Sequence, residues 1–137
     1  MLECLILGDS IAVGVSQVKP ECVAIAKGGW NSWQYNKDFG AKAQSKEAKT
    51  IIISLGANDH KGVKTYNELY KLREKLQGQR VFWILPNERL KPKQVDEVMM
   101  IAITFGDTVI PRPINNMSAD GVHPTGKGYK ELADKIK

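Results

Sequence analysis

Three short segments, far apart in the 137-residue chain, carry side chains that together could transfer an acyl group. They are Gly8-Asp9-Ser10, Gly56-Ala57-Asn58-Asp59 and Asp120-Gly121-Val122-His123, and each lies at or near the end of an apolar run typical of a β-strand. Ligands bind at the carboxyl ends of the strands in an open parallel sheet, so we expect the three segments to meet there. Together they supply a nucleophile, a base, a carboxylate to orient the base and an amide donor for an oxyanion.

Ser10 is the candidate nucleophile, and it needs a neighbouring base because a free hydroxyl is a weak nucleophile at neutral pH. A strand-to-helix turn would expose its oxygen and direct the N-terminus of the helix at the reacting group. Serine is also a preferred helix N-cap, so an ordinary cap is the alternative for this residue.

His123 is the candidate base, and Asp120, three residues earlier, is the candidate group that orients its ring. Pro124 favours an extended backbone at His123, so we expect the imidazole to project from a loop. A turn can bring the Asp120 carboxylate to one ring nitrogen and leave the other nitrogen to accept the serine proton. Without Ser10, the segment would be interpreted as an ordinary turn.

Oxyanion donors are predicted at two further strand ends. The side-chain amide of Asn58 could donate there, although an asparagine supported by Gly56 also suits a plain turn. A backbone N–H of the glycine pair could face the same pocket, because glycine permits a close approach. We take the Gly29 N–H as this donor, and the Gly28 N–H is the alternative if the turn is shifted by one residue. A simple flexible turn would explain the two glycines equally well.

Apolar runs alternate with helical patterns along the whole chain. Strands are predicted at Leu2–Leu7, Cys22–Ala26, Thr50–Leu55, Arg80–Leu85 and Thr108–Ile110. Helices are predicted over Ile11–Val18, from about Ser32 to Ala48, over Tyr66–Leu76, from about Pro92 to Gly106, and from Thr125 or Gly126 onward. Gly78 is predicted to end the third of these helices. The fourth has an apolar stripe that consists of Val95, Val98, Met99, Ala102 and Ile103. This alternation implies parallel strands joined by right-handed crossovers. We therefore predict one domain over residues 1–137, a three-layer α/β/α sandwich with a flavodoxin-like five-stranded parallel sheet in the order 2-1-3-4-5.

Composition is that of an ordinary globular chain, with 42% hydrophobic and 26% charged residues. The longest apolar runs are strand-sized, and no signal peptide precedes the first strand, so we expect no membrane segment and a protein that is cytoplasmic or released by a non-signal route. Scattered lysines account for the net charge of +5 and indicate no nucleic-acid partner; an anionic polymer as substrate is the alternative. Cys4 and Cys22 fall on the first two predicted strands, and their thiols could approach each other if these strands are neighbours. We interpret them instead as small core residues in a reducing compartment.

In order and approximate spacing, the three segments and Gly29 resemble the motif blocks of the SGNH (GDSL-type) hydrolases. The resemblance extends over the chain and implies a flavodoxin-like fold and no metal or other cofactor. It implies Ser10 as nucleophile and N–H donor, Gly29 and Asn58 as the other oxyanion donors, His123 as base and Asp120 as its orienter. The glycine block departs from the family, because Ala24 and Ala26 stand where a polar residue is often found. The chain is also short for the family, which favours a small acyl group.

Aromatic residues follow the glycine pair at the same predicted edge. Trp30, Trp33 and Tyr35 could stack on sugar rings, or they could simply pack at a helix start. Asn87, directly after the fourth strand, could also contact substrate, whereas Trp83 is expected in the core. The loop before the catalytic pair carries further polar side chains that could shape the leaving-group side: Arg112, Asn115 and Asn116.

The sequence therefore predicts a serine ester hydrolase that acts on a small acyl ester or an acylated carbohydrate, and it indicates no oligomeric state. One alternative is a non-catalytic domain that binds a glycan or an anionic polymer. Another is a metal-dependent phosphohydrolase that uses Asp9, Asp59 and Asp120, although the chain lacks an Asp-x-Asp pair. We expect Asp59 instead to tie down its loop, and His60 to be exposed and uninvolved.

Overall fold

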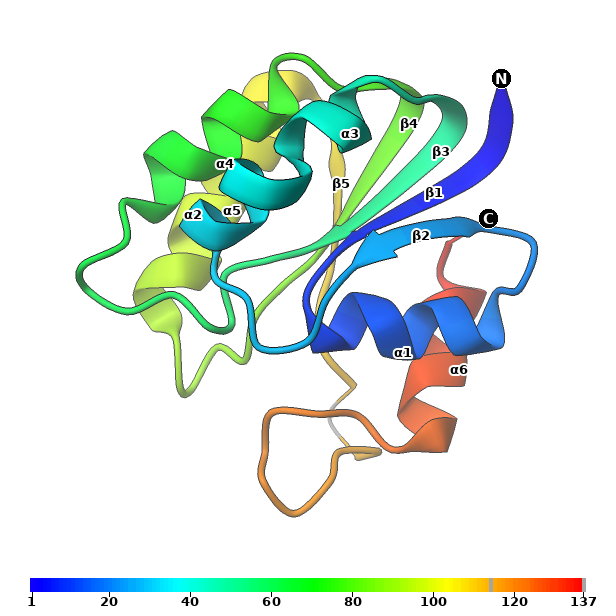
Figure 1. Cartoon of the computed structure of the whole chain (residues 1–137). Helices are drawn as coiled ribbons and strands as arrows, with labels where there is room; N and C mark the ends of the chain where they lie inside the picture. Colours follow the sequence, from blue (N-terminus) through cyan, green and yellow to red (C-terminus); the bar gives the residue numbers. More distant parts are fainter. Residues whose placement is uncertain (114, 137) are drawn as a thin grey trace.

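A computed structural model describes residues 1–113 and 115–136, and it shows one parallel sheet between two layers of helices (Figure 1). The strands are β1 (Leu2–Gly8), β2 (Val23–Ala26), β3 (Glu47–Ser54), β4 (Gln77–Ile84) and β5 (Thr108–Ile110). All neighbouring strands pair in parallel, and their order is β2-β1-β3-β4-β5. The predicted fold class and strand order are confirmed.

Helices cover both faces of the sheet (Figure 1). One face carries α1 (Ser10–Val18) and α6 (Gly126–Asp134). The other carries α2 (Ser32–Tyr35), a π-helical segment η1 (Asn36–Gly40), α3 (Ala41–Gln44), α4 (Thr65–Arg73) and α5 (Pro92–Phe105). Within the described residues, none of the helices has the length and apolarity needed to cross a membrane.

Alternate residues of β1 explain the two layers, because successive side chains of a strand point to opposite faces. Leu5 and Leu7 pack into the core beneath α4 and α5, whereas Cys4 and Ile6 pack into the core beneath α1 and α6. The approach of α1 to α6 depends on Gly14, since a Cβ there would lie 2.2 Å from the Tyr129 ring. The sheet is thus buried on both sides, as near-continuous apolar strands require.

The structure corrects several predicted boundaries. The helical segment that begins at Ser32 stops at Gln44, and β3 already begins at Glu47. Gly78 does not end a helix: it lies in β4, opposite Ala48 of β3. A side chain on Gly78 would press against Ile51, which explains a glycine at this position.

The predicted apolar stripe of α5 is only partly right. Val95, Val98 and Ala102 are buried as predicted, but Met99 is 39% exposed and Ile103 is 77% exposed. Ile101, which is absent from that stripe, is fully buried instead. The predicted end of this helix is confirmed, because Gly106 caps it in the left-handed conformation with φ of 72°.

Cys4 and Cys22 form a disulfide, so the prediction of two free thiols is wrong. Parallel pairing of β1 with β2 sets Leu5 opposite Val23, and this register brings the preceding cysteines together with their Cα atoms 4.5 Å apart. The bond ties β1, which leads to Ser10, to the start of β2.

Loss of this disulfide is expected to destabilise the fold. Closing a loop with a sequence separation of 18 lowers the entropy of the unfolded chain, which corresponds to about 3 kcal/mol of stability. Urea unfolding of Cys22→Ser should show this loss in the free energy of unfolding, and the wild type should show a similar loss after reduction. Reductant should leave Cys22→Ser unchanged; equal stability of reduced and oxidised wild type would contradict the expectation.

Candidate active site

The turn between β1 and α1 is built around Gly8 and Asp9. Gly8 has φ of 137°, and an added Cβ would lie 1.9 Å from the Ser54 carbonyl oxygen, so only glycine fits here. The Asp9 N–H donates to that same carbonyl oxygen (3.0 Å). The Asp9 carboxylate accepts from the Ile11 N–H (3.0 Å) and thereby caps α1. Because Asp9 is the cap, the alternative of Ser10 as an ordinary N-cap is wrong, and the Ser10 hydroxyl is available for another partner.

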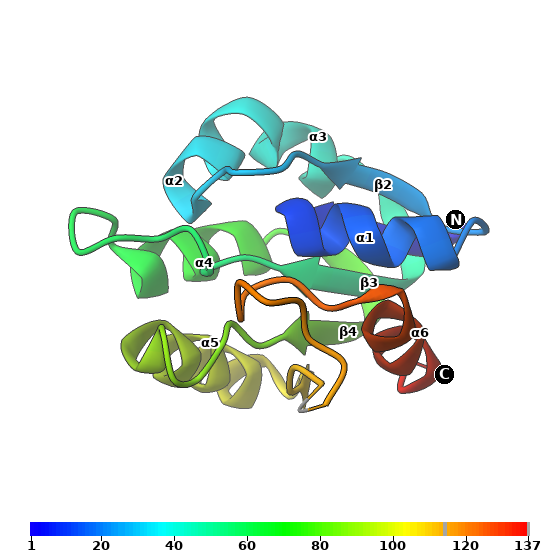
Figure 2. The same ribbon diagram turned by 90° about the horizontal axis from the view of Figure 1, so that it is seen from below.

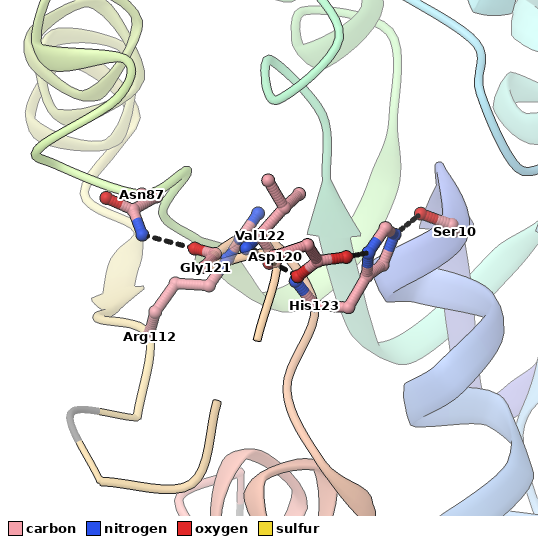
Figure 3. A network of polar contacts seen from close by, with 7 residues as sticks. All are labelled: Ser10, Asn87, Arg112, Asp120, Gly121, Val122 and His123. Atoms are coloured by element: carbon pink, nitrogen blue, oxygen red, sulfur yellow. Dashed lines mark hydrogen bonds and ion pairs between the residues drawn. The ribbon is translucent and has the colours of Figure 1, made fainter. Parts of the chain in front are cut away.

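That partner is His123 (Figure 3). The Ser10 Oγ lies 2.8 Å from the His123 Nε2, and the His123 Nδ1 lies 2.7 Å from the Asp120 Oδ2. With a proton on Nδ1 directed at the carboxylate, Nε2 is left to accept the serine proton. The structure therefore brings together the three side chains that the sequence predicts as nucleophile, base and orienting carboxylate.

Backbone hydrogen bonds fix the Asp120 carboxylate. Its Oδ1 accepts from the Val122 N–H (2.9 Å) and from the His123 N–H (3.0 Å). These bonds and the bond to the His123 ring hold the pKa of Asp120 well below its usual range. The carboxylate is thus ionised and held against the imidazole, although half of its side chain is exposed.

The loop that carries this pair is closed upon itself. The Ser118 N–H donates to the His123 carbonyl oxygen (2.7 Å), and Met117 pairs with Pro124 in an antiparallel bridge. Gly121 takes a left-handed conformation with φ of 70° at the tip. Figure 2 shows the molecule from the side of α1 and α6, and this orange loop lies in front of the ends of β3 and β4.

The predicted oxyanion donors lie at the same edge. An added Cβ on Gly28 would be 3.5 Å from the Ser10 Cβ, so the glycine turn passes directly beside the hydroxyl-bearing residue. Gly29 has φ of 81°, which a residue with a side chain rarely adopts. The Asn58 amide donates to the Trp30 carbonyl oxygen (3.0 Å), which fixes the Nδ2 position and leaves its second hydrogen for another acceptor.

Asp59 ties down its loop. This fully buried carboxylate accepts from the Ser32 N–H (2.8 Å), the Ser32 hydroxyl (2.7 Å) and the Thr65 hydroxyl (2.8 Å). His60 beside it is exposed, and its Nδ1 accepts from the Gly62 N–H. Between residues 1 and 136, apart from position 114, no group of three His, Cys, Asp or Glu side chains is placed to hold a metal, so the alternative of a metal site built on the aspartates lacks a donor set.

The aromatic residues separate into surface and core. Trp33 is 51% exposed and lines an open cavity of about 390 Å³ between the start of α2 and the loop after Asn58. Trp30 is half-buried and stacks on Phe39 with ring centroids 5.3 Å apart. Trp83 is fully buried and donates to Asp107, which confirms its place in the core. Tyr35 is fully buried too, and its hydroxyl donates to the Ile25 carbonyl oxygen (2.6 Å), so the expectation that it stacks on a sugar is wrong.

Three groups behind the candidate triad were absent from the sequence prediction or were assigned another role. Asn87 donates to the Gly121 carbonyl oxygen, and Arg112 donates to the Val122 carbonyl oxygen (Figure 3). Asp9 is completely buried, and burial raises its pKa to about 6. A strand followed by an Asx cap could have indicated the role of Asp9 in the turn, but no local signal indicates the contacts of Asn87 and Arg112.

A scan against models of known protein families found no match, and a search of curated protein sequences found none. Solved structures do match. The chain has the fold of the GDSL-type hydrolases. A GDSL-like lipase from Bacteroides thetaiotaomicron superposes with a TM-score of 0.70 at 16% identity, over 97% of this chain and 84% of that one. This likeness confirms the resemblance expected from the motif blocks at the level of the fold.

Two further structures of the same fold have stated activities. A lipase/acylhydrolase from Enterococcus faecalis superposes with a TM-score of 0.70 at 15% identity, over 96% of this chain and 92% of that one. An acetylxylan esterase from Geobacillus stearothermophilus gives a TM-score of 0.71 at 17% identity, over 96% and 90% of the two chains. Proteins with this fold thus include esterases that act on an acetylated polysaccharide.

Proposed function

We propose that this protein is a serine ester hydrolase that removes a small acyl group, such as an O-acetyl group on a carbohydrate, through an acyl-serine intermediate. The observation that supports it most directly is the continuous contact from the Ser10 hydroxyl through the His123 ring to the Asp120 carboxylate. A serine so placed has both the base that removes its proton and the charge that stabilises the imidazolium.

In the first step, the Ser10 proton passes to the Nε2 of His123 as the Ser10 Oγ attacks the ester carbonyl carbon. The resulting tetrahedral oxyanion accepts hydrogen bonds from the Ser10 N–H, the Gly29 N–H and the Asn58 amide. Ser10 is the first residue of α1, so its N–H has no partner within the helix. The bond to the alcohol then breaks, His123 returns the proton to the leaving oxygen, and the acyl group stays on Ser10.

In the second step, His123 removes a proton from water, and the hydroxide attacks the acyl carbon. Collapse of this second tetrahedral species breaks the bond to the Ser10 Oγ, which regains a proton from His123. The acid leaves, and the site returns to its starting state without any cofactor. Asp120 stays ionised throughout and stabilises the imidazolium in both steps.

A carbohydrate substrate is supported by the cavity beside Trp33. An exposed indole offers a flat face for a sugar ring. The capping box at the start of α2 uses the side-chain oxygens of Asn31 and Gln34. Their amide N–H groups can therefore serve a ligand, and Lys64 adds a cationic donor to the same cavity. The acetylxylan esterase of this fold provides a precedent for such a substrate class.

Reaction with a fluorophosphonate, followed by peptide mapping, tests the proposed nucleophile without a guess at the substrate. We expect a single adduct, on the peptide that contains Ser10. Release of acetate from acetylated xylo-oligosaccharides, measured in parallel, tests the substrate class. A protein that binds such oligosaccharides but takes up no fluorophosphonate would be a binding domain and would refute the hydrolase.

Replacing Asn58 with alanine is expected to lower kcat for p-nitrophenyl acetate by roughly 100- to 1,000-fold, because one oxyanion donor is lost. KM should change little, since the donor acts mainly in the transition state. Asn67→Ala, at an exposed position of α4, is the matched control and should retain wild-type kinetics. An Asn58→Ala enzyme with nearly unchanged kcat would remove Asn58 from the oxyanion hole.

A further inference from the structure

Arg112 lies behind the catalytic loop, on the segment that leaves β5. Its Nη1 donates to the carbonyl oxygen of Val122, the residue between Gly121 and His123 (Figure 3). The same Val122 donates its N–H to the Asp120 carboxylate. Arg112 therefore bonds to the short segment 120–123, which carries both Asp120 and His123.

The rest of the Arg112 guanidinium is buried. Its Nε and Nη2 have no hydrogen-bond partner among the described residues, and neither has the Oδ2 of Asp9. Burial raises the pKa of Asp9 and lowers the pKa of Arg112, and the opposite charge of each group partly offsets the shift of the other. Buried polar atoms without partners are rare, so these three atoms need an explanation.

Asp9 is in turn part of the serine turn itself. It precedes Ser10, caps α1 through the Ile11 N–H and accepts from the Ser54 hydroxyl (3.1 Å). Any group that fixes the Asp9 carboxylate also fixes the start of α1. Arg112 thus bonds to the loop that carries His123 and interacts through its charge with the turn that carries Ser10. The separation of these two elements sets the distance from the Ser10 Oγ to the His123 Nε2.

We propose that Arg112 is a positioning residue of the hydrolase, and that its guanidinium holds the loop of Asp120 and His123 against the turn of Asp9 and Ser10. The inference rests on the proposed function. A guanidinium suits the task because its planar group presents five donors in fixed directions and can serve both sides at once. Rigid support of this kind is what a catalytic constellation requires, since a displacement of about 1 Å can cost on the order of 100-fold in rate.

Kinetics of Arg112→Ala test the proposal. Because Arg112 does not take part in bond making, we expect kcat for p-nitrophenyl acetate to fall by roughly 10- to 100-fold, with KM little changed. Millimolar methylguanidinium should restore part of the lost kcat by occupying the vacated space, which a merely structural defect would not allow. Arg89→Ala is the matched control, because Arg89 lines the same hollow beside the loop but is exposed.

Two outcomes would overturn the proposal: wild-type kcat in Arg112→Ala, or a loss of kcat that methylguanidinium does not reverse in a folded variant. If Arg112→Ala fails to fold, Arg112→Lys is the deciding variant, because lysine keeps the charge but lacks the forked geometry of the guanidinium. Arg112→Lys should have a kcat below that of the wild type. A wild-type kcat in Arg112→Lys would overturn the proposal as well. Fluorophosphonate labelling of the wild type separates the two hypotheses. Without labelling at Ser10 the hydrolase itself fails, whereas labelling together with normal Arg112→Ala kinetics refutes only the role of Arg112.

Discussion

Replacement of Ser10 with alanine should lower kcat for p-nitrophenyl acetate by at least ~10⁴-fold, because the attacking oxygen is lost and only binding and the oxyanion donors remain. The fold should survive, because the Ser10 hydroxyl bonds to His123 and does not cap α1, which is capped by Asp9. Steady-state kinetics and thermal unfolding of the variant beside the wild type measure both quantities. The fluorophosphonate adduct should also disappear.

His123→Ala provides the complementary test of the same chemistry. Since the hydroxyl and the imidazole act as one unit, the double variant Ser10→Ala/His123→Ala should be no slower than the single variants, a strong departure from additivity. Turnover by Ser10→Ala close to that of the wild type would show that another group attacks the ester. Additive losses in the double variant would mean that the two side chains act separately, despite the 2.8 Å contact between them.

The fold could be predicted from the sequence because its strongest signals are local. β3 carries a run of isoleucines that is buried on both faces of the sheet, and such a run reads as a central parallel strand without any knowledge of its neighbours. Signals that depend on packing were harder to interpret. Gly78 is interpreted from the sequence as a helix end because glycine is common there and rare in strands. Its place in β4 is explained by the Ile51 side chain across the sheet, which leaves no room for a Cβ.

The candidate site divides in the same way. Ser10 and Asn58 could be proposed because each follows a predicted strand end, and the topology of a parallel sheet brings such ends together. His123 could be proposed because Asp120 precedes it by three residues on a loop. The Cys4–Cys22 bond depends on the register between two strands, and the support from Arg112 depends on a contact between a loop and a buried carboxylate. Neither relation leaves a trace in the spacing of residues along the chain. Sequence therefore indicates the reacting groups better than it indicates what holds them.

Replacement of Asp120 with asparagine should cost about 10⁴-fold in kcat while leaving the loop in place. The two N–H groups of Val122 and His123 need an acceptor, so they will bind the amide oxygen in the position of Oδ1. The amide NH₂ then faces the His123 Nδ1, which must accept instead of donate. The proton moves to Nε2, and the ring can no longer take the proton of Ser10. Kinetics of Asp120→Asn against Asp96→Asn, an exposed aspartate of α5, measure the effect, and a loss of less than tenfold would show that the carboxylate does not set the tautomer.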